Sequence, residues 1–172
     1  MTTWPPRRQR DGGVDRVPLV GVAGQLWLCG KHAIGPDHAG VIAATGSTTV
    51  VCLVERHELA DRYPSYLDWL VINVGGCAIW FPIPDLHAPP IESVVTLVDD
   101  LVARLGNGEH VLIHCAAGFG RTGTLAACVM VTLGIEVDDA LAIISLHRPM
   151  AGPEVGAQRE LVRAMSVRAS VR

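Results

Sequence analysis

Hydrophobic and polar positions along the chain predict strands and helices in alternation. The runs QLWLCG, STTVVCLV, CAIWFPIPD and HVLIHC are apolar and rich in β-branched or aromatic residues, which is typical of buried strands. The runs DHAGVIAATG, IESVVTLVDDLVARLGNG, RTGTLAACVMVTLG, VDDALAIISLHR and PEVGAQRELVRAM are typical of helices, and glycine follows several of them. The alternation predicts an α/β fold with a central, largely parallel sheet flanked by helices.

The ends of this pattern suggest a simple domain organisation. The opening MTTWPPRRQRDGG is rich in Pro, Arg and Gly and has no periodicity, so residues 1–16 are predicted to form a flexible N-terminal arm. A strand is expected in VPLVGV, next to QLWLCG, and ERHELADRYPSYLDWL is expected to be helical or irregular with a break at Pro64. Residues 17–172 are therefore predicted to form a single domain.

Composition narrows the possible partners. The chain has 172 residues, of which 49% are hydrophobic and 18% charged, with a formal net charge of −3. This charge gives no general attraction to nucleic acid or to an anionic membrane, so neither is expected as a partner. The longest apolar stretch, residues 125–135, is shorter than the roughly 20 residues that span a bilayer.

The cysteines indicate a reducing compartment. Five cysteines are spread along the chain without a CxxC pair, and no basic start leads into an apolar run that would signal export. A cytoplasmic location is expected. Cys52 and Cys128 fall within apolar strand and helix patterns and are predicted to be core residues.

The segment VLIHCAAGFGRTGT, residues 111–124, carries the most specific pattern in the chain. It predicts a buried strand, then a loop with Gly118 and Gly120, then a helix that begins near Arg121. Such a loop can turn its backbone N–H groups onto one anion above a helix N-terminus, which makes a phosphate site. Cys115 would lie at its floor, where N–H dipoles and a guanidinium favour the nucleophilic thiolate. Arg121 can hold two phosphoryl oxygens with its planar fork.

The residues His114 to Gly123, HCAAGFGRTG, resemble the signature loop of the protein tyrosine and dual-specificity phosphatase superfamily. The resemblance extends over approximately residues 25–165. It implies that Cys115 is the nucleophile, that Thr122 hydrogen-bonds the sulfur, and that His114 orients the loop. It also implies that the phosphoryl group is bound by Arg121 and by the loop residues Ala116, Ala117, Gly118, Phe119 and Gly120.

The same resemblance implies a general acid on a mobile loop some 30 residues before the cysteine, which protonates the leaving oxygen and then deprotonates the attacking water. Asp85 stands 30 positions before Cys115 (115 − 85), in the proline-rich segment FPIPDLHAPP. His87 is the alternative acid. Further along, Arg148, Pro149 and the segment up to Gln158 resemble the closing element of the family, which makes Gln158 a candidate for positioning the attacking water.

The expected substrate is a phosphorylated protein or peptide. The chain has no counterpart of the phosphotyrosine-recognition loop found in the larger tyrosine-specific enzymes, so phosphotyrosine, phosphoserine and phosphothreonine all stay open. The loop spacers carry no charge, unlike those of members that act on inositol phospholipids, which disfavours a lipid. No metal or organic cofactor is expected, since His32, Asp37 and His38 lack a usual metal-ligand spacing.

Two other functions are weighed against this one. A rhodanese-like sulfurtransferase also places a cysteine in an anion-binding loop, and a phosphate-binding module would keep the loop without turnover. The sulfurtransferase is disfavoured by the presence of His114, Thr122 and a candidate acid. The binding module is disfavoured because both a nucleophile and an acid are present. Sequence alone leaves open a role for Cys29 or Cys77 as a resolving thiol.

Overall fold

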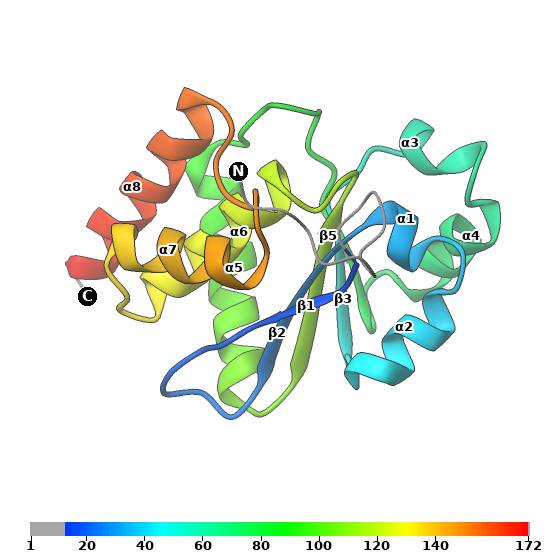
Figure 1. Cartoon of the computed structure of the whole chain (residues 1–172), viewed down its shortest axis with the longest axis horizontal. Helices are drawn as coiled ribbons and strands as arrows, with labels where there is room; N and C mark the ends of the chain where they lie inside the picture. The colour runs from blue at the N-terminus through cyan, green and yellow to red at the C-terminus, as the bar shows by residue number, and fades with distance from the viewer. Residues whose placement is uncertain (1–12, 172) are drawn as a thin grey trace.

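A mixed sheet forms the centre of the molecule (Figure 1), as seen in a computed structural model that describes residues 13–171. Within those residues the sheet has five strands in the order β1-β2-β5-β3-β4, and only β1 runs antiparallel to its neighbour. The strands are β1 (Asp15–Val17), β2 (Gln25–Gly30), β3 (Thr49–Cys52), β4 (Ala78–Trp80) and β5 (His110–Cys115). The predicted α/β class with a largely parallel sheet is confirmed.

Helices cover both faces of this sheet. Figure 1 shows α5 to α8 gathered on one side and α1, α2 and α4 on the other. Their bounds are α1 (Lys31–Ile34), α2 (His38–Thr45), α3 (His57–Ala60), α4 (Pro64–Asn73), α5 (Ile91–Gly106), α6 (Gly120–Thr132), α7 (Val137–His147) and α8 (Gly156–Ser170). Because both faces are covered, the inner strands are mostly apolar, and all four residues of β3, TVVC, are buried.

The central strand β5 positions the signature loop. It lies between β2 and β3, is parallel to both, and pairs Cys115 with Gly30 and His114 with Cys52. The carboxyl ends of the three strands therefore meet at one edge of the sheet, where open α/β folds place their ligands. Cys115 is the last residue of β5, so the loop begins at this edge.

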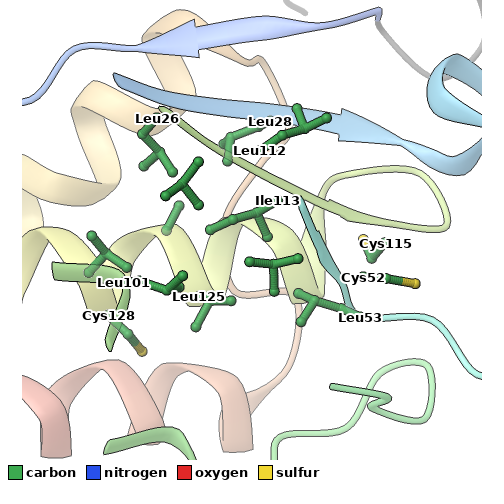
Figure 2. Close-up of a cluster of buried hydrophobic side chains, with 14 of the residues drawn as sticks. Leu26, Leu28, Cys52, Leu53, Leu101, Leu112, Ile113, Cys115, Leu125 and Cys128 are labelled. Carbon is green, nitrogen blue, oxygen red and sulfur yellow. The ribbon is translucent and has the colours of Figure 1, made fainter. Parts of the chain in front are cut away.

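The hydrophobic core lies behind that edge (Figure 2). Leucine and isoleucine side chains of β2 and β5 pack against α5 and α6, for example Ile113 against the layer that contains Leu101 and Leu125. Cys52 and Cys115 lie at one end of this cluster and Cys128 at the other. Burial raises the pKa of the Cys52 and Cys128 thiols to about 12, and their predicted core positions are confirmed.

The segment VPLVGV differs from the sequence-based expectation, whereas the segment around Pro64 agrees with it. Only Val17 of VPLVGV belongs to a strand, because Pro18 has no N–H to donate to a ladder and the following residues bend. The segment around Pro64 forms two helices, with Pro64 at the first position of α4. Strand β1 lies across the predicted boundary between the N-terminal arm and the domain. Residues 1–12 lie outside the described residues. The division of the chain into an arm, 1–16, and a domain, 17–172, therefore stays a prediction.

Candidate active site

The loop from Cys115 to Arg121 turns its carbonyl groups away from its own centre. The Ala116 oxygen accepts from the Lys31 N–H at 2.9 Å, and the Phe119 oxygen accepts from Gly123 at 2.8 Å and Gly152 at 3.1 Å. A trans peptide points its N–H opposite to its C=O. The N–H groups that follow these outward carbonyls therefore face inward, which is the arrangement an anion needs.

Arg148, the residue that follows α7, fixes the other two carbonyls of the loop. Its Nη2 donates to the Ala117 oxygen at 2.9 Å, and its Nε donates to the Gly118 oxygen at 2.7 Å. The guanidinium is fully buried, and its Nη1 also donates to Asp15 Oδ2 of β1 at 2.8 Å. One buried arginine thus holds the loop from behind and ties it to the edge strand.

Gly118 is required at its position by both backbone angle and space. Its φ is +75°, in the left-handed region that side chains disfavour, and a Cβ there would overlap the carbonyl of Cys29 and the guanidinium of Arg148. The sequence analysis expected a permissive backbone here. The structure adds that the loop packs directly against β2.

Arg121 projects from the first turn of α6 and is held by Glu58 of α3. Its Nη1 donates to Glu58 Oε2 at 2.8 Å, its Nη2 donates to Oε1 at 3.0 Å, and Nη1 also donates to the Ile83 oxygen at 2.8 Å. Burial opposes the ionised form of Glu58, but the hydrogen bonds and charge of Arg121 lower the pKa of this carboxyl below its usual value. The guanidinium is thus oriented before any ligand binds.

Asp85 lies in the loop after β4 and reaches the same cavity. Its Oδ1 is 3.3 Å from Arg121 Nη2, while its side chain remains 68% exposed. The cavity has a volume of about 130 Å³ and is lined by Asp85, Leu86, Cys115, Ala116, Ala117, Phe119, Gly120, Arg121 and Glu154. Residues 30 positions apart in the sequence, Asp85 and Cys115, are therefore brought to one site.

His114 lies beneath the loop and is completely buried. Its Nε2 shares a 2.6 Å hydrogen bond with the Tyr66 hydroxyl of α4, and its Nδ1 is 3.3 Å from the Cys115 carbonyl oxygen. Burial lowers the pKa of His114 to about 4, and burial also raises the pKa of Tyr66 well above its ordinary value. Both groups are therefore neutral near pH 7, as a buried hydrogen-bonded pair must be.

Gln158 and Thr122, two other predicted residues, lie near the loop without a contact that defines their roles. Gln158 is buried, its Oε1 accepts from the Glu154 N–H at 2.8 Å, and its Nε2 donates to the His87 oxygen at 3.2 Å. The Thr122 hydroxyl is buried and makes no hydrogen bond to another described residue. The water-positioning role of Gln158 and the bond from Thr122 to sulfur stay predictions.

His87, the alternative acid, is not among the residues that line the cavity of Cys115. Its Nδ1 lies 2.7 Å from the backbone oxygen of Asp85, and its own N–H donates to the Pro84 oxygen. Leu86 between them has a φ of +61°, so the turn is tight. In this geometry His87 shapes the loop that carries Asp85.

The remaining cysteines are placed differently from one another. Cys77 is exposed and hydrogen-bonds Asn73 at the amino end of β4, at the edge of the sheet opposite to Cys115. Cys29 is buried in β2, where it pairs in register with His114. Cys52 at the end of β3 lies close enough for the charge of Cys115 to contribute to its raised pKa.

Sequence reasoning missed the two carboxylates Glu58 and Glu154 and the clamping role of Arg148. Glu58 is 63 positions from Arg121, in a segment whose pattern predicted no chemistry. Arg148 was noted as part of the closing element, but the four acceptors named for it come from two distant parts of the chain, residues 13–15 and residues 117–118. No local signal in the sequence marks such contacts.

Between residues 13 and 171, no group of three or more His, Cys, Asp or Glu side chains is placed to hold a metal ion. No helix in that same range is long and apolar enough to cross a membrane.

The fold and the site together define a class of protein. A parallel sheet ends in an anion-binding loop with a cysteine at its floor, an arginine on the following helix and an aspartate from a neighbouring loop, which is the domain architecture of cysteine-dependent phosphatases. A family model confirms it: residues 25–170 match "PTP-SAK: Swiss Army Knife protein, DSP-PTPase phosphatase domain". The chain belongs to this family of dual-specificity and tyrosine phosphatase domains. The family predicted from its signature loop is therefore confirmed.

Relatives of known name agree with this assignment. The chain is 36% identical over 107 residues to cyclin-dependent kinase inhibitor 3 of Sus scrofa, covering 62% of this chain and 50% of that protein. It is 30% identical over 105 residues to protein tyrosine phosphatase type IVA 3 of Mus musculus, covering 60% and 56%. The chain thus spans about half the length of the curated relatives it matches.

Solved structures show the same fold. Kinase associated phosphatase, crystallised with its catalytic-site cysteine replaced by serine, superposes with a TM-score of 0.76 at 22% identity and covers 92% of this chain and 96% of its own. Tk-PTP in its active form superposes with a TM-score of 0.67 at 26% identity, covering 89% and 97%.

Proposed function

We propose that this chain hydrolyses phosphate monoesters on protein side chains through a phosphocysteine intermediate on Cys115. The observation that carries the proposal is the single cavity of about 130 Å³ in which Cys115, Arg121 and Asp85 meet under a loop whose carbonyls all point outward. Membership of the phosphatase family supports the reaction class. No cofactor enters the mechanism.

The first step transfers the phosphoryl group to sulfur. The Cys115 thiolate attacks phosphorus while the inward N–H groups and Arg121 bind the equatorial oxygens. Glu58 keeps the guanidinium in place, and the phosphoryl oxygens take the position beside Nη2 where Asp85 now lies at 3.3 Å. Asp85 then gives its proton to the leaving oxygen, and Thr122 stabilises the sulfur when the intermediate is later hydrolysed.

Phosphorylated proteins or peptides are the proposed substrates. Arg121 is the one cation among the described residues that line the cavity, so the lining has no further positive charge to favour the additional phosphates of an inositol lipid. Phosphotyrosine, phosphoserine and phosphothreonine all carry the one phosphoryl group that the cavity holds. A panel of matched phosphopeptides that differ only in the phosphorylated residue measures the preference.

The decisive experiment replaces the nucleophile. Cys115→Ser is expected to abolish release of inorganic phosphate from a phosphopeptide while phosphopeptide binding is kept, because a serine hydroxyl stays protonated where a thiolate forms. Cys77→Ser is the matched control, since this exposed thiol lies at the opposite edge of the sheet. Substantial turnover by Cys115→Ser would contradict the phosphocysteine mechanism.

The same preparation separates the alternative functions. A rhodanese-like sulfurtransferase would form thiocyanate from thiosulfate and cyanide, and a binding module would bind the phosphopeptide without releasing phosphate. Phosphate release by the unmodified protein, lost in Cys115→Ser and kept in Cys77→Ser, is the result expected of the phosphatase.

A further inference from the structure

Glu154 brings a carboxylate into the cavity that neither the signature loop nor the acid loop accounts for. It lies in the segment between α7 and α8 and lines the same cavity as Cys115, Asp85 and Arg121. It also packs against the start of α6, where a Cβ on Gly120 would overlap its Oε2. The glycine at the edge of the phosphate loop thus leaves room for this side chain.

The carboxylate of Glu154 differs from that of Glu58, which is committed to Arg121. Both oxygens of Glu58 accept hydrogen bonds from the guanidinium, whereas the Glu154 carboxylate makes no hydrogen bond or ion pair within residues 13–171. Its backbone is nevertheless fixed, because the Glu154 N–H donates to Gln158 Oε1 at 2.8 Å. An unoccupied acceptor at a fixed position is suited to binding a small donor such as water.

The charges around Glu154 favour a basic carboxylate. Glu154 is an exposed residue that is partly covered on its cavity side; this partial burial raises its pKa and the negative charge of Asp85 raises it further, while the charge of Arg121 opposes both. A carboxylate of higher pKa accepts a proton more readily once it is ionised. Enzymes often place two carboxylates with different surroundings in one active site, where one acts as the general acid and the other as the general base. Asp85 and Glu154 are such a pair.

The geometry points to Glu154 as a catalytic residue that positions and deprotonates the water in hydrolysis of the phosphocysteine. This inference rests on the proposed function, and it assigns to Glu154 the positioning of water that sequence reasoning assigned to Gln158 and the deprotonation of that water that it assigned to Asp85. Both polar ends of the Gln158 amide are already bonded to backbone groups, of Glu154 and of His87. From the same segment it is Glu154 that reaches the cavity.

In this step the bonds and protons balance without any further reactant. The water oxygen forms a bond to phosphorus as the bond from phosphorus to Cys115 Sγ breaks, and the electron pair of that bond stays on sulfur as the thiolate. The water gives one proton to the Glu154 carboxylate, which returns it to solvent. Inorganic phosphate leaves and Cys115 is ready for another cycle.

The test separates the two steps with 4-nitrophenyl phosphate in a rapid-mixing experiment. Release of 4-nitrophenol reports formation of the phosphocysteine, and the steady-state rate reports its hydrolysis. Glu154→Gln is expected to keep a fast burst of 4-nitrophenol equal to the enzyme concentration while the steady-state rate falls about 10²-fold. Acid quenching followed by mass spectrometry is expected to find phosphorylated Cys115 in that variant.

Two further variants sharpen the result. Glu160→Gln is the matched control, since it makes the same substitution at an exposed position of α8 outside the cavity, and wild-type kinetics are expected. Glu154→Ala is expected to accumulate the same intermediate, and added formate, a free carboxylate, is expected to restore part of its steady-state rate. The thermal midpoints of both Glu154 variants should match that of the unmodified protein, because the side chain is exposed.

Several outcomes would overturn the inference. One is an unchanged steady-state rate in Glu154→Gln, with the intermediate accumulating in Gln158→Ala instead. Another is a burst that slows in parallel with turnover, because Glu154 would then act in the first step. A third outcome is normal turnover by the unmodified enzyme and by every variant, with no phosphorylated Cys115 in any of them. This outcome would refute the phosphocysteine mechanism itself. It differs from the first two outcomes because the unmodified enzyme also lacks the intermediate.

Discussion

Three carboxylates surround Arg121, and each has different surroundings. Glu58 is bonded on both oxygens and stays ionised, Asp85 is mostly exposed at 3.3 Å from the guanidinium, and Glu154 lies on the far wall against Gly120. The differences follow from tertiary position, because aspartate and glutamate have similar intrinsic acidity. They assign orientation of the arginine to Glu58 and leave the proton transfers to the other two.

The general acid gives a prediction that depends on the leaving group. Asp85→Ala is expected to lower kcat toward a phosphopeptide by about 10²- to 10⁴-fold, the usual contribution of general acid catalysis. The loss toward 4-nitrophenyl phosphate should be smaller, because 4-nitrophenolate is stable without a proton. Steady-state kinetics on both substrates measure the difference, with Asp61→Ala, an exposed aspartate after α3, as the control. Equal losses on the two substrates would mean that Asp85 only shapes its loop.

At the scale of the elements, the site depends on how α7, the phosphate loop and β1 are joined. Arg148 follows the last turn of α7 and bonds two loop carbonyls and Asp15 of β1 at once. The ring of Phe119 lies 5.4 Å from its guanidinium carbon, which adds a cation–π contact at the loop itself. The conformation of the loop is therefore set by an element that follows it in the sequence.

Removing this clamp should cost both stability and anion binding. Arg148→Met breaks the buried ion pair with Asp15 at 2.8 Å, so the free energy of unfolding is expected to fall by about 3–5 kcal/mol. Vanadate should inhibit the variant more weakly, because the carbonyls of Ala117 and Gly118 lose their donors. Urea denaturation and vanadate inhibition measure the two effects.

The control for this variant is Arg168→Met. Arg168 of α8 pairs with Asp99 of α5 at 2.8 Å, but its side chain is partly exposed and the pair lies away from the loop. Surface pairs contribute about 0–1 kcal/mol, and vanadate inhibition should be unchanged. Similar small losses in both variants would show that Arg148 is dispensable for the loop.

For the molecule as a whole, the buried histidine makes stability depend on pH. The pKa of His114 is about 4 in the folded protein, against 6.5 for an ordinary histidine. Between these two pH values His114 binds a proton in the unfolded chain but not in the folded chain. Its contribution to the free energy of unfolding is therefore fully present above pH 6.5 and is lost as the pH falls toward 4. At 1.36 kcal/mol for each pH unit, the contribution lost is about 3 kcal/mol.

Urea denaturation at a series of pH values tests this expectation. The free energy of unfolding of the unmodified protein should fall between pH 6.5 and pH 4, and the slope should be reduced in His114→Gln. His147→Gln, at an exposed position of α7, controls for the substitution itself. An unchanged slope in His114→Gln would assign the acid sensitivity to other groups.

Much of the molecule could be predicted from local patterns in the sequence. Periodicity predicted β2, β3, β5 and the long helices, since each pattern reflects which face of one element is buried. The signature loop was recognisable because its spacing is contiguous, and family comparison confirmed the class. The strand expected in VPLVGV failed at Pro18, where the loss of one donor outweighed the apolar composition.

The sequence by itself therefore determined the fold class, the nucleophile, the phosphate-binding arginine and a candidate acid, all of which lie in contiguous or regularly spaced segments. Only the tertiary structure decided which side chains hold and complete that site. Glu58 comes from α3, and Arg148 and Glu154 come from the segment between α7 and α8; they meet the loop because three parallel strands end at one edge. Contacts between residues so far apart depend on packing of the whole sheet, and no local pattern encodes them.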